Sequence, residues 1–132
     1  MKLFLPILCF FAALTLRAEV PRITPANAAE LVSSGTAVLV DVREPAEWTK
    51  SGVAAPAVLL SKSDFDAGRK GEWKSFLKSV GDKPIIVYCH SGRRAAIVGA
   101  ALAAEGHKVM NAGGFSDWEA AGLPTRKVTP KP

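Results

Sequence analysis

One cysteine of this chain stands where its neighbours could make it reactive. An apolar run at residues 85–88 leads into Cys89, and a short glycine-containing loop then connects it to an alanine-rich helical stretch. Backbone N–H groups that curl toward a helix N-terminus create a positive potential, which stabilises a thiolate and attracts an anionic substrate. We therefore predict that Cys89 is a nucleophile and not an inert cysteine of the core.

The residues that follow Cys89 predict a small cradle for an anion. Gly92 permits a tight curl of the backbone, so the N–H groups of residues 90–95 would point toward the sulfur and a bound oxyanion. Arg94 offers a planar fork of donors for a sulfonate-like group, with a surface salt bridge as its alternative, and Arg93 adds positive potential. The predicted substrate-binding loop comprises His90, Ser91, Gly92, Arg93, Arg94 and Ala95.

The histidines do not extend this site into another catalytic arrangement. His90 could donate to a substrate oxygen, tune Cys89 or face solvent, and we do not expect it to act as a general base. The chain has two histidines and two cysteines, and their spacing fits no metal-ligand cluster. We expect neither a metal nor another cofactor.

Helices alternate with short apolar strands along the chain. The predicted helices span residues 25–33, 45–50, 73–80, 95–105 and 115–121. The predicted strands span residues 37–42, 57–60, 85–88 and 108–111, and the polar stretch after Thr125 is expected to be frayed. This alternation is typical of an α/β domain with a central, mostly parallel sheet flanked by helices.

Asp41 lies at the end of one predicted strand and Cys89 directly follows another, so they should meet at one edge of the sheet. In a parallel sheet the carboxyl ends of the strands border the ligand crevice. Asp41 begins a short charged segment at the end of its strand, just as Cys89 begins the loop after its own. We expect Asp41 and Arg43 to form an ion pair that supports the pocket wall, and a catalytic role for the pair is less favoured.

The first 18 residues have the pattern of a signal peptide. Lys2 precedes an uncharged apolar stretch, residues 3–16, and Ala18 ends a segment similar to a cleavage site. The stretch is shorter than the roughly 20 apolar residues that cross a bilayer, so we favour cleavage over an uncleaved anchor. We expect export to the periplasm, with a eukaryotic secretory route as the alternative, and no stable membrane insertion of the mature chain.

The rest of the chain suits one domain. Its formal charge is +3, because the first 18 residues carry two of the positive charges that give the whole chain +5. Lys and Arg residues are scattered and are not interleaved with aromatic residues, so no nucleic-acid partner is expected. Cys89 is then the only cysteine, which leaves no internal disulfide, and a monomer is the default expectation.

Three motifs, in order, resemble the rhodanese family, specifically an exported single-domain rhodanese of the thiosulfate sulfurtransferase type. The motifs are Asp41-Val42-Arg43-Glu44 with Glu47 and Trp48, then Tyr88-Cys89-His90-Ser91-Gly92-Arg93-Arg94, then Ala112-Gly113-Gly114-Phe115 with Trp118 and Gly122-Leu123-Pro124. The resemblance implies a rhodanese-like three-layer domain over residues 19–127, followed by a flexible tail over residues 128–132.

The resemblance also implies sulfur transfer by double displacement. The Cys89 thiolate would take the outer sulfur of thiosulfate or a similar donor, hold it as a persulfide, and pass it to cyanide or a thiol acceptor. The alternative is an exported persulfide carrier or partner-binding module with little turnover of its own. The partners expected are thus a small anionic sulfur donor and a thiophilic acceptor.

One segment departs from the family's pattern. The family usually carries Gly-His-Ile-x-Gly-Ala after the Asp-Val-Arg motif, whereas this chain reads Gly52-Val53-Ala54-Ala55-Pro56-Ala57. The changes are expected to alter local geometry and stability more than activity.

A phosphatase of the tyrosine-phosphatase type is the competing enzyme class, because a cysteine loop closed by arginine also binds phosphate. Such phosphatases place five residues between the cysteine and the arginine, whereas four separate Cys89 from Arg94. The shorter loop favours a persulfide sulfur over a phosphoryl group.

Overall fold

A four-stranded parallel sheet forms the centre of the computed structural model, which describes residues 19–131. The strands are β1 (Val38–Asp41), β3 (Val58–Leu59), β4 (Ile85–Cys89) and β5 (Val109–Gly114). Their order in the sheet is β3-β1-β4-β5, and every neighbouring pair is parallel. The predicted signal peptide, residues 1–18, lies outside the described residues.

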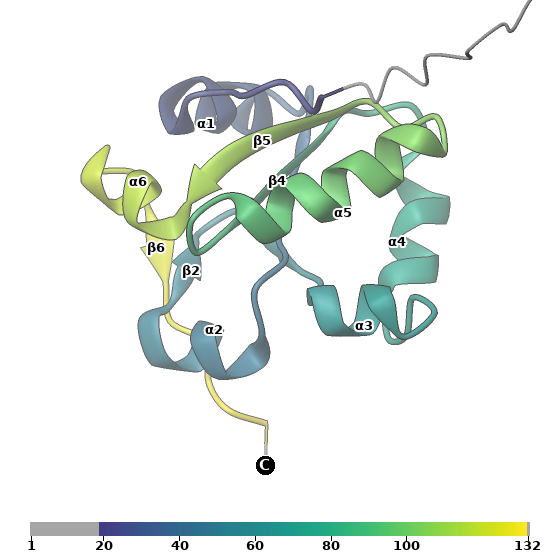
Figure 1. The fold of residues 1–132 in the computed structure, drawn as a ribbon. Helices are drawn as coiled ribbons and strands as arrows, with labels where there is room; N and C mark the ends of the chain where they lie inside the picture. Colours follow the sequence, from purple (N-terminus) through teal and green to yellow (C-terminus); the bar gives the residue numbers. More distant parts are fainter. Residues whose placement is uncertain (1–18, 132) are drawn as a thin grey trace, which may run out of the picture.

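Helices cover both faces of this sheet, so the domain has three layers (Figure 1). Each face of the sheet has its own apolar core, and the side chains of β4 alternate between the two. Those of Ile85, Val87 and Cys89 belong to one core, and those of Ile86 and Tyr88 to the other. The first core is closed by α4 (Trp73–Val80) and α5 (Arg93–Ala104), and the second by α1 (Pro25–Ser33) and α6 (Phe115–Ala120). The predicted α/β fold with a mostly parallel sheet flanked by helices is confirmed.

The first two helices begin where the sequence provides a cap or a proline. The Thr24 hydroxyl accepts the N–H of Asn27, and Pro25 occupies the first position of α1, which spans the predicted residues. Helix α2 (Pro45–Ser51) also begins with a proline, and α4 has its predicted bounds. Helix α5 begins two residues earlier than predicted, at Arg93.

Three short elements were not predicted. They are α3 (Lys62–Asp66) and the strands β2 (Val53–Ala54) and β6 (Thr125–Arg126), which pair antiparallel in a second sheet. The expectation that the chain is frayed directly after Thr125 is therefore wrong at Arg126, whose guanidinium donates to the carbonyl oxygens of Ala55 and Ala57 at 3.1 and 2.9 Å. A flexible tail over residues 128–132 stays a prediction.

The segment that departs from the family pattern is the one that β6 covers. Gly52 has φ +78°, and a Cβ there would lie 2.8 Å from the Arg126 carbonyl oxygen. Val53 and Ala54 are buried, so the altered residues form part of the packed domain.

Among residues 19–131, no helix has the length and apolar character needed to cross a membrane.

Tyr88 provides a test of how β2 is held against the main sheet. Its hydroxyl accepts the N–H of Ala54 at 3.0 Å, and both residues are buried. Tyr88→Phe should lower the free energy of unfolding by about 1–3 kcal/mol, because a buried N–H would lose its acceptor. Urea unfolding followed by tryptophan fluorescence measures this change, and an unchanged midpoint and slope would show that another acceptor satisfies Ala54.

Candidate active site

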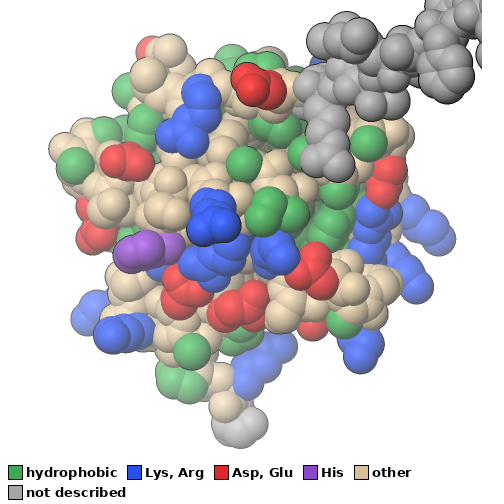
Figure 2. Space-filling view, in the orientation of Figure 1, with side chains coloured by type: hydrophobic (Ala, Val, Ile, Leu, Met, Phe, Trp, Pro, Cys, Tyr) green, Lys and Arg blue, Asp and Glu red, His purple; other side chains and the backbone are tan. Residues whose placement is uncertain are grey.

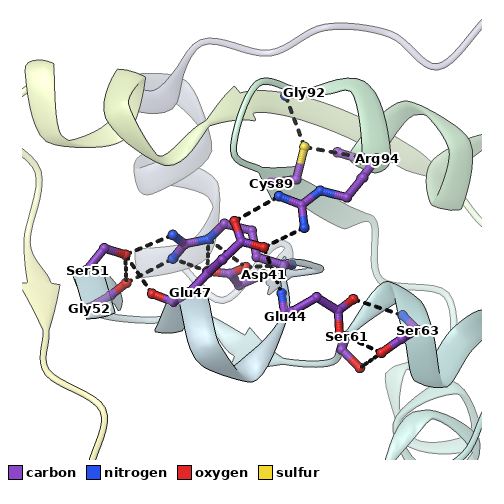
Figure 3. Close-up of polar contacts among 12 residues, drawn as sticks. Asp41, Glu44, Glu47, Ser51, Gly52, Ser61, Ser63, Cys89, Gly92 and Arg94 are labelled. Atoms are coloured by element: carbon purple, nitrogen blue, oxygen red, sulfur yellow. Dashed lines mark hydrogen bonds and ion pairs between the residues drawn. The ribbon is translucent and has the colours of Figure 1, made fainter. Parts of the chain in front are cut away.

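The Cys89 sulfur lies at the carboxyl end of β4 and faces the start of α5 (Figure 3). The Gly92 N–H donates to Sγ at 3.0 Å, and the Ala95 N–H approaches it at 3.5 Å. The residue is 1% exposed, and it is the only free cysteine among residues 19–131. Two backbone donors of the loop thus point at the sulfur, an arrangement that stabilises negative charge on it.

The loop has room for this curl only because of glycine. Gly92 has φ +92°, and a Cβ there would lie 2.8 Å from the Arg22 guanidinium and 3.2 Å from the Gly113 Cα. A Cβ at Gly114 would clash with the His90 carbonyl oxygen, so the end of β5 packs directly against the loop. Any larger residue at these positions would move the donors away from the sulfur.

Asn111 supports the same loop and was not identified from the sequence. Its amide donates to the Gly92 carbonyl oxygen at 2.9 Å, and its side-chain oxygen accepts the Gly113 N–H at 2.9 Å. The residue is 2% exposed, and it lies on β5 beside β4. A buried polar side chain that forms hydrogen bonds at both ends indicates a supporting role, but its burial can be recognised only once the strand has been placed.

The other loop residues divide into exposed and buried positions. His90, Ser91 and Arg93 are exposed, whereas Ala95 is buried beside Cys89. Near the middle of the face drawn in Figure 2, where α5 begins, Lys or Arg side chains lie directly above Asp or Glu side chains, with a His to one side. The surface around the nucleophile therefore carries both signs of charge.

Arg94 makes the salt bridge that was the alternative to substrate contact. It reaches from α5 to Glu47 on α2 (Figure 3), with its two terminal nitrogens 2.6 and 2.9 Å from the two carboxylate oxygens. This contact lowers the pKa of Glu47 to about 2. The pKa of Arg94 is raised, chiefly by its hydrogen bonds to Glu47. The sequence presents Glu47 only as part of a motif, and the structure brings it into the site.

Asp41 and Arg43 form the predicted ion pair. The Arg43 guanidinium donates to the Asp41 carboxylate at 2.8 Å, to the Ser51 hydroxyl at 2.9 Å and to the Gly52 carbonyl oxygen at 2.8 Å. Burial lowers the pKa of Arg43, but the contact with Asp41 outweighs it and the net shift is upward. The pair therefore joins the end of β1 to the junction of α2 and β2.

No metal site accompanies these residues within the part of the chain that the structure describes. Residues 19–131 contain no group of three or more His, Cys, Asp or Glu side chains that could hold a metal ion.

Residues 24–121 match the family described as the rhodanese-like domain. The thiosulfate sulfurtransferase GlpE of Actinobacillus succinogenes is 32% identical over 104 residues, covering 77% of this chain and 86% of that protein. The polysulfide-sulfur transferase homodimer of Wolinella succinogenes has a TM-score of 0.64 and 26% identity, over 86% of this chain and 82% of that one. A Rhodopseudomonas palustris protein described as a possible tyrosine phosphatase has a TM-score of 0.67 and 26% identity, over 81% and 85%.

The Asp41–Arg43 pair provides a test of stability. Asp41→Asn should lower the free energy of unfolding by about 3–5 kcal/mol, because it leaves the Arg43 charge buried without its counter-ion. Glu105→Gln is the matched control, since it breaks the partly exposed pair with Arg69 and should cost less than about 1 kcal/mol. Urea titration of both variants measures the difference, and equal losses would contradict a dominant role for the buried pair.

The Arg94–Glu47 pair should make stability depend on acid pH. Because the pKa of Glu47 falls from 4.5 to about 2 on folding, the pair contributes fully above pH 4.5 and its contribution is lost as the pH falls toward 2. We expect about 1 kcal/mol, since both side chains are partly exposed and screened by water. Urea titrations of wild type and Glu47→Gln at several pH values should show this difference shrinking in acid, and a constant difference would contradict it.

Proposed function

Because the chain belongs to the rhodanese family, with a thiosulfate sulfurtransferase among its relatives, we propose that it transfers a sulfane sulfur through a persulfide on Cys89. The observation that carries the proposal is the Cys89 sulfur itself, at the end of β4, with the N–H groups of Gly92 and Ala95 directed at it. These donors stabilise the attacking thiolate and then the sulfur that it receives.

In the first half-reaction the Cys89 thiolate attacks the outer sulfur of thiosulfate. A new S–S bond forms on the enzyme as the S–S bond of thiosulfate breaks, and sulfite leaves with the electron pair of that bond. In the second half-reaction cyanide, or a thiolate acceptor, attacks the outer persulfide sulfur. Thiocyanate or a new persulfide leaves, and the Cys89 thiolate is regenerated with no net change in the enzyme.

The burial of Cys89 supports a small donor. The residue is 1% exposed, so a reacting atom must fit within the loop that surrounds the sulfur. A terminal sulfur atom is a compact group, and the sulfonate that it carries can remain at the mouth, near the exposed Arg93 and the partly exposed Arg94. Thiosulfate or a similar small anionic donor therefore suits the site, and no cofactor takes part in this scheme.

Two other hypotheses predict different activities. A persulfide carrier or partner-binding module would take up sulfur and release it slowly to cyanide. A phosphatase would turn over an aryl phosphate, the class suggested by one structural neighbour's description. The four residues between Cys89 and Arg94 favour sulfur transfer over phosphate transfer.

The compartment and assembly state are proposed from the sequence. The pattern of residues 1–18 supports export to the periplasm, where a protein with no internal disulfide would keep Cys89 as its reactive thiol. We propose that the mature chain works as a monomer, with no nucleic-acid partner.

Intact-mass measurement after incubation with thiosulfate tests the first half-reaction. We expect a gain of about one sulfur atom, roughly 32 Da, that cyanide removes with release of thiocyanate. Cys89→Ser, which keeps the size of the side chain, should show no gain. If neither protein gains sulfur from thiosulfate or from a polysulfide, sulfur transfer by this chain is refuted.

A further inference from the structure

Arg94 binds a carboxylate of the protein itself. Both terminal nitrogens of its guanidinium face the two carboxylate oxygens of Glu47, at 2.6 and 2.9 Å. This is the bidentate geometry in which a guanidinium binds an oxyanion most strongly. The arginine that the sequence offers to a sulfonate-like group therefore holds an anionic group of the protein in that position.

Glu47 is fixed by its own helix and is not a loosely placed surface residue. It occupies the third position of α2, and the Glu44 N–H donates to its carboxylate at 3.2 Å. The positive charge of Arg43 lies near enough to contribute to the lowered pKa of Glu47. A second Arg–Glu pair, between Arg69 and Glu105, lies just beyond the C-terminal end of α5, away from Cys89.

A carboxylate and a sulfonate make the same demand on this arginine. Each is an oxyanion that accepts two parallel N–H donors. One edge of a guanidinium cannot bind a carboxylate and a sulfonate at the same time. The Glu47 charge also repels an anion that approaches Cys89, whereas it has little effect on a neutral reagent.

We propose that Glu47 is a specificity-determining residue that competes with anionic reagents for Arg94 at the mouth of the Cys89 site. The inference deepens the proposed function, because it predicts that Glu47 weakens the binding of anionic sulfur donors relative to less charged ones. An anionic donor binds these two nitrogens of Arg94 only when the Glu47 carboxylate releases them.

Alkylation of Cys89 tests this competition without requiring sulfur transfer. Iodoacetate is an anion and iodoacetamide is its neutral analogue. In both reactions the thiolate forms a C–S bond as the C–I bond breaks, and iodide leaves with the electron pair. The ratio of the two rate constants, measured by intact mass at one pH and low salt, reports how the site treats negative charge and cancels changes in thiolate content.

Glu47→Gln should raise the iodoacetate-to-iodoacetamide ratio at least about threefold, because it removes the repelling charge and frees Arg94. In an Arg94→Gln background the same substitution should raise the ratio distinctly less, because there is no guanidinium for the substitution to release. Glu105→Gln is the matched control: it removes an equal charge from the other pair and should leave the ratio at the wild-type value.

Two results would overturn the proposal. A ratio that is unchanged or lower in Glu47→Gln would mean that Glu47 serves to position Arg94 for anions. An equal rise with and without Arg94 would mean that Glu47 acts through its charge alone. Circular dichroism checks that each variant folds; if Glu47→Gln does not, Glu47→Asp is measured instead, since its shorter side chain loses the fork, and an unchanged ratio there contradicts the proposal.

Steady-state kinetics then separate this inference from the proposed function. With thiosulfate as donor, Glu47→Gln should lower KM severalfold and change kcat less, whereas Glu105→Gln should change neither. If wild type transfers no sulfur but the alkylation ratios follow the expected pattern, the proposed function fails and the role of Glu47 stands. If sulfur transfer is observed and the ratios do not respond, the role of Glu47 fails alone.

Discussion

Arg43 is a charged side chain that is only 2% exposed, and the Asp41 carboxylate at the end of β1 sets its position. A buried guanidinium must satisfy its remaining donors, so Arg43 also binds the Ser51 hydroxyl and the Gly52 carbonyl oxygen. These bonds fix the end of α2, the helix that carries Glu47, and Glu47 in turn sets the direction of Arg94. The ionic half of the site thus depends on one desolvated ion pair.

The opposite half of the site is held by steric fit. The end of β5 touches the Cys89 loop so closely that Gly92 and Gly114 leave no room for a Cβ, and Asn111 of the same strand bonds to Gly92 and Gly113. The donors that face the sulfur are backbone groups, so their positions are set by packing and do not depend on the identity of the exposed side chains. The charged side chains at the mouth of the site can therefore be substituted without moving the backbone donors that face the sulfur.

Much of the fold could be predicted from local patterns. Apolar runs such as residues 85–88 and capped helices such as residues 25–33 carry their own signals, and Cys89 followed by Gly92 was enough to identify a candidate nucleophile. The missed features are of another kind. The strands β2 and β6 are two residues each, and the Glu47–Arg94 contact joins residues 47 positions apart. Such features arise from tertiary packing, which no local period or spacing encodes.

The strand β6 is the last element of the described chain, yet its partner in the second sheet, β2, lies more than seventy residues before it in the sequence. When the chain emerges from the ribosome or a translocation pore with its N-terminus first, Val53 and Ala54 have no β6 to pair with until residues 125 and 126 follow. The antiparallel pairing that covers the α2–β2 junction therefore cannot form until the end of the domain has been delivered.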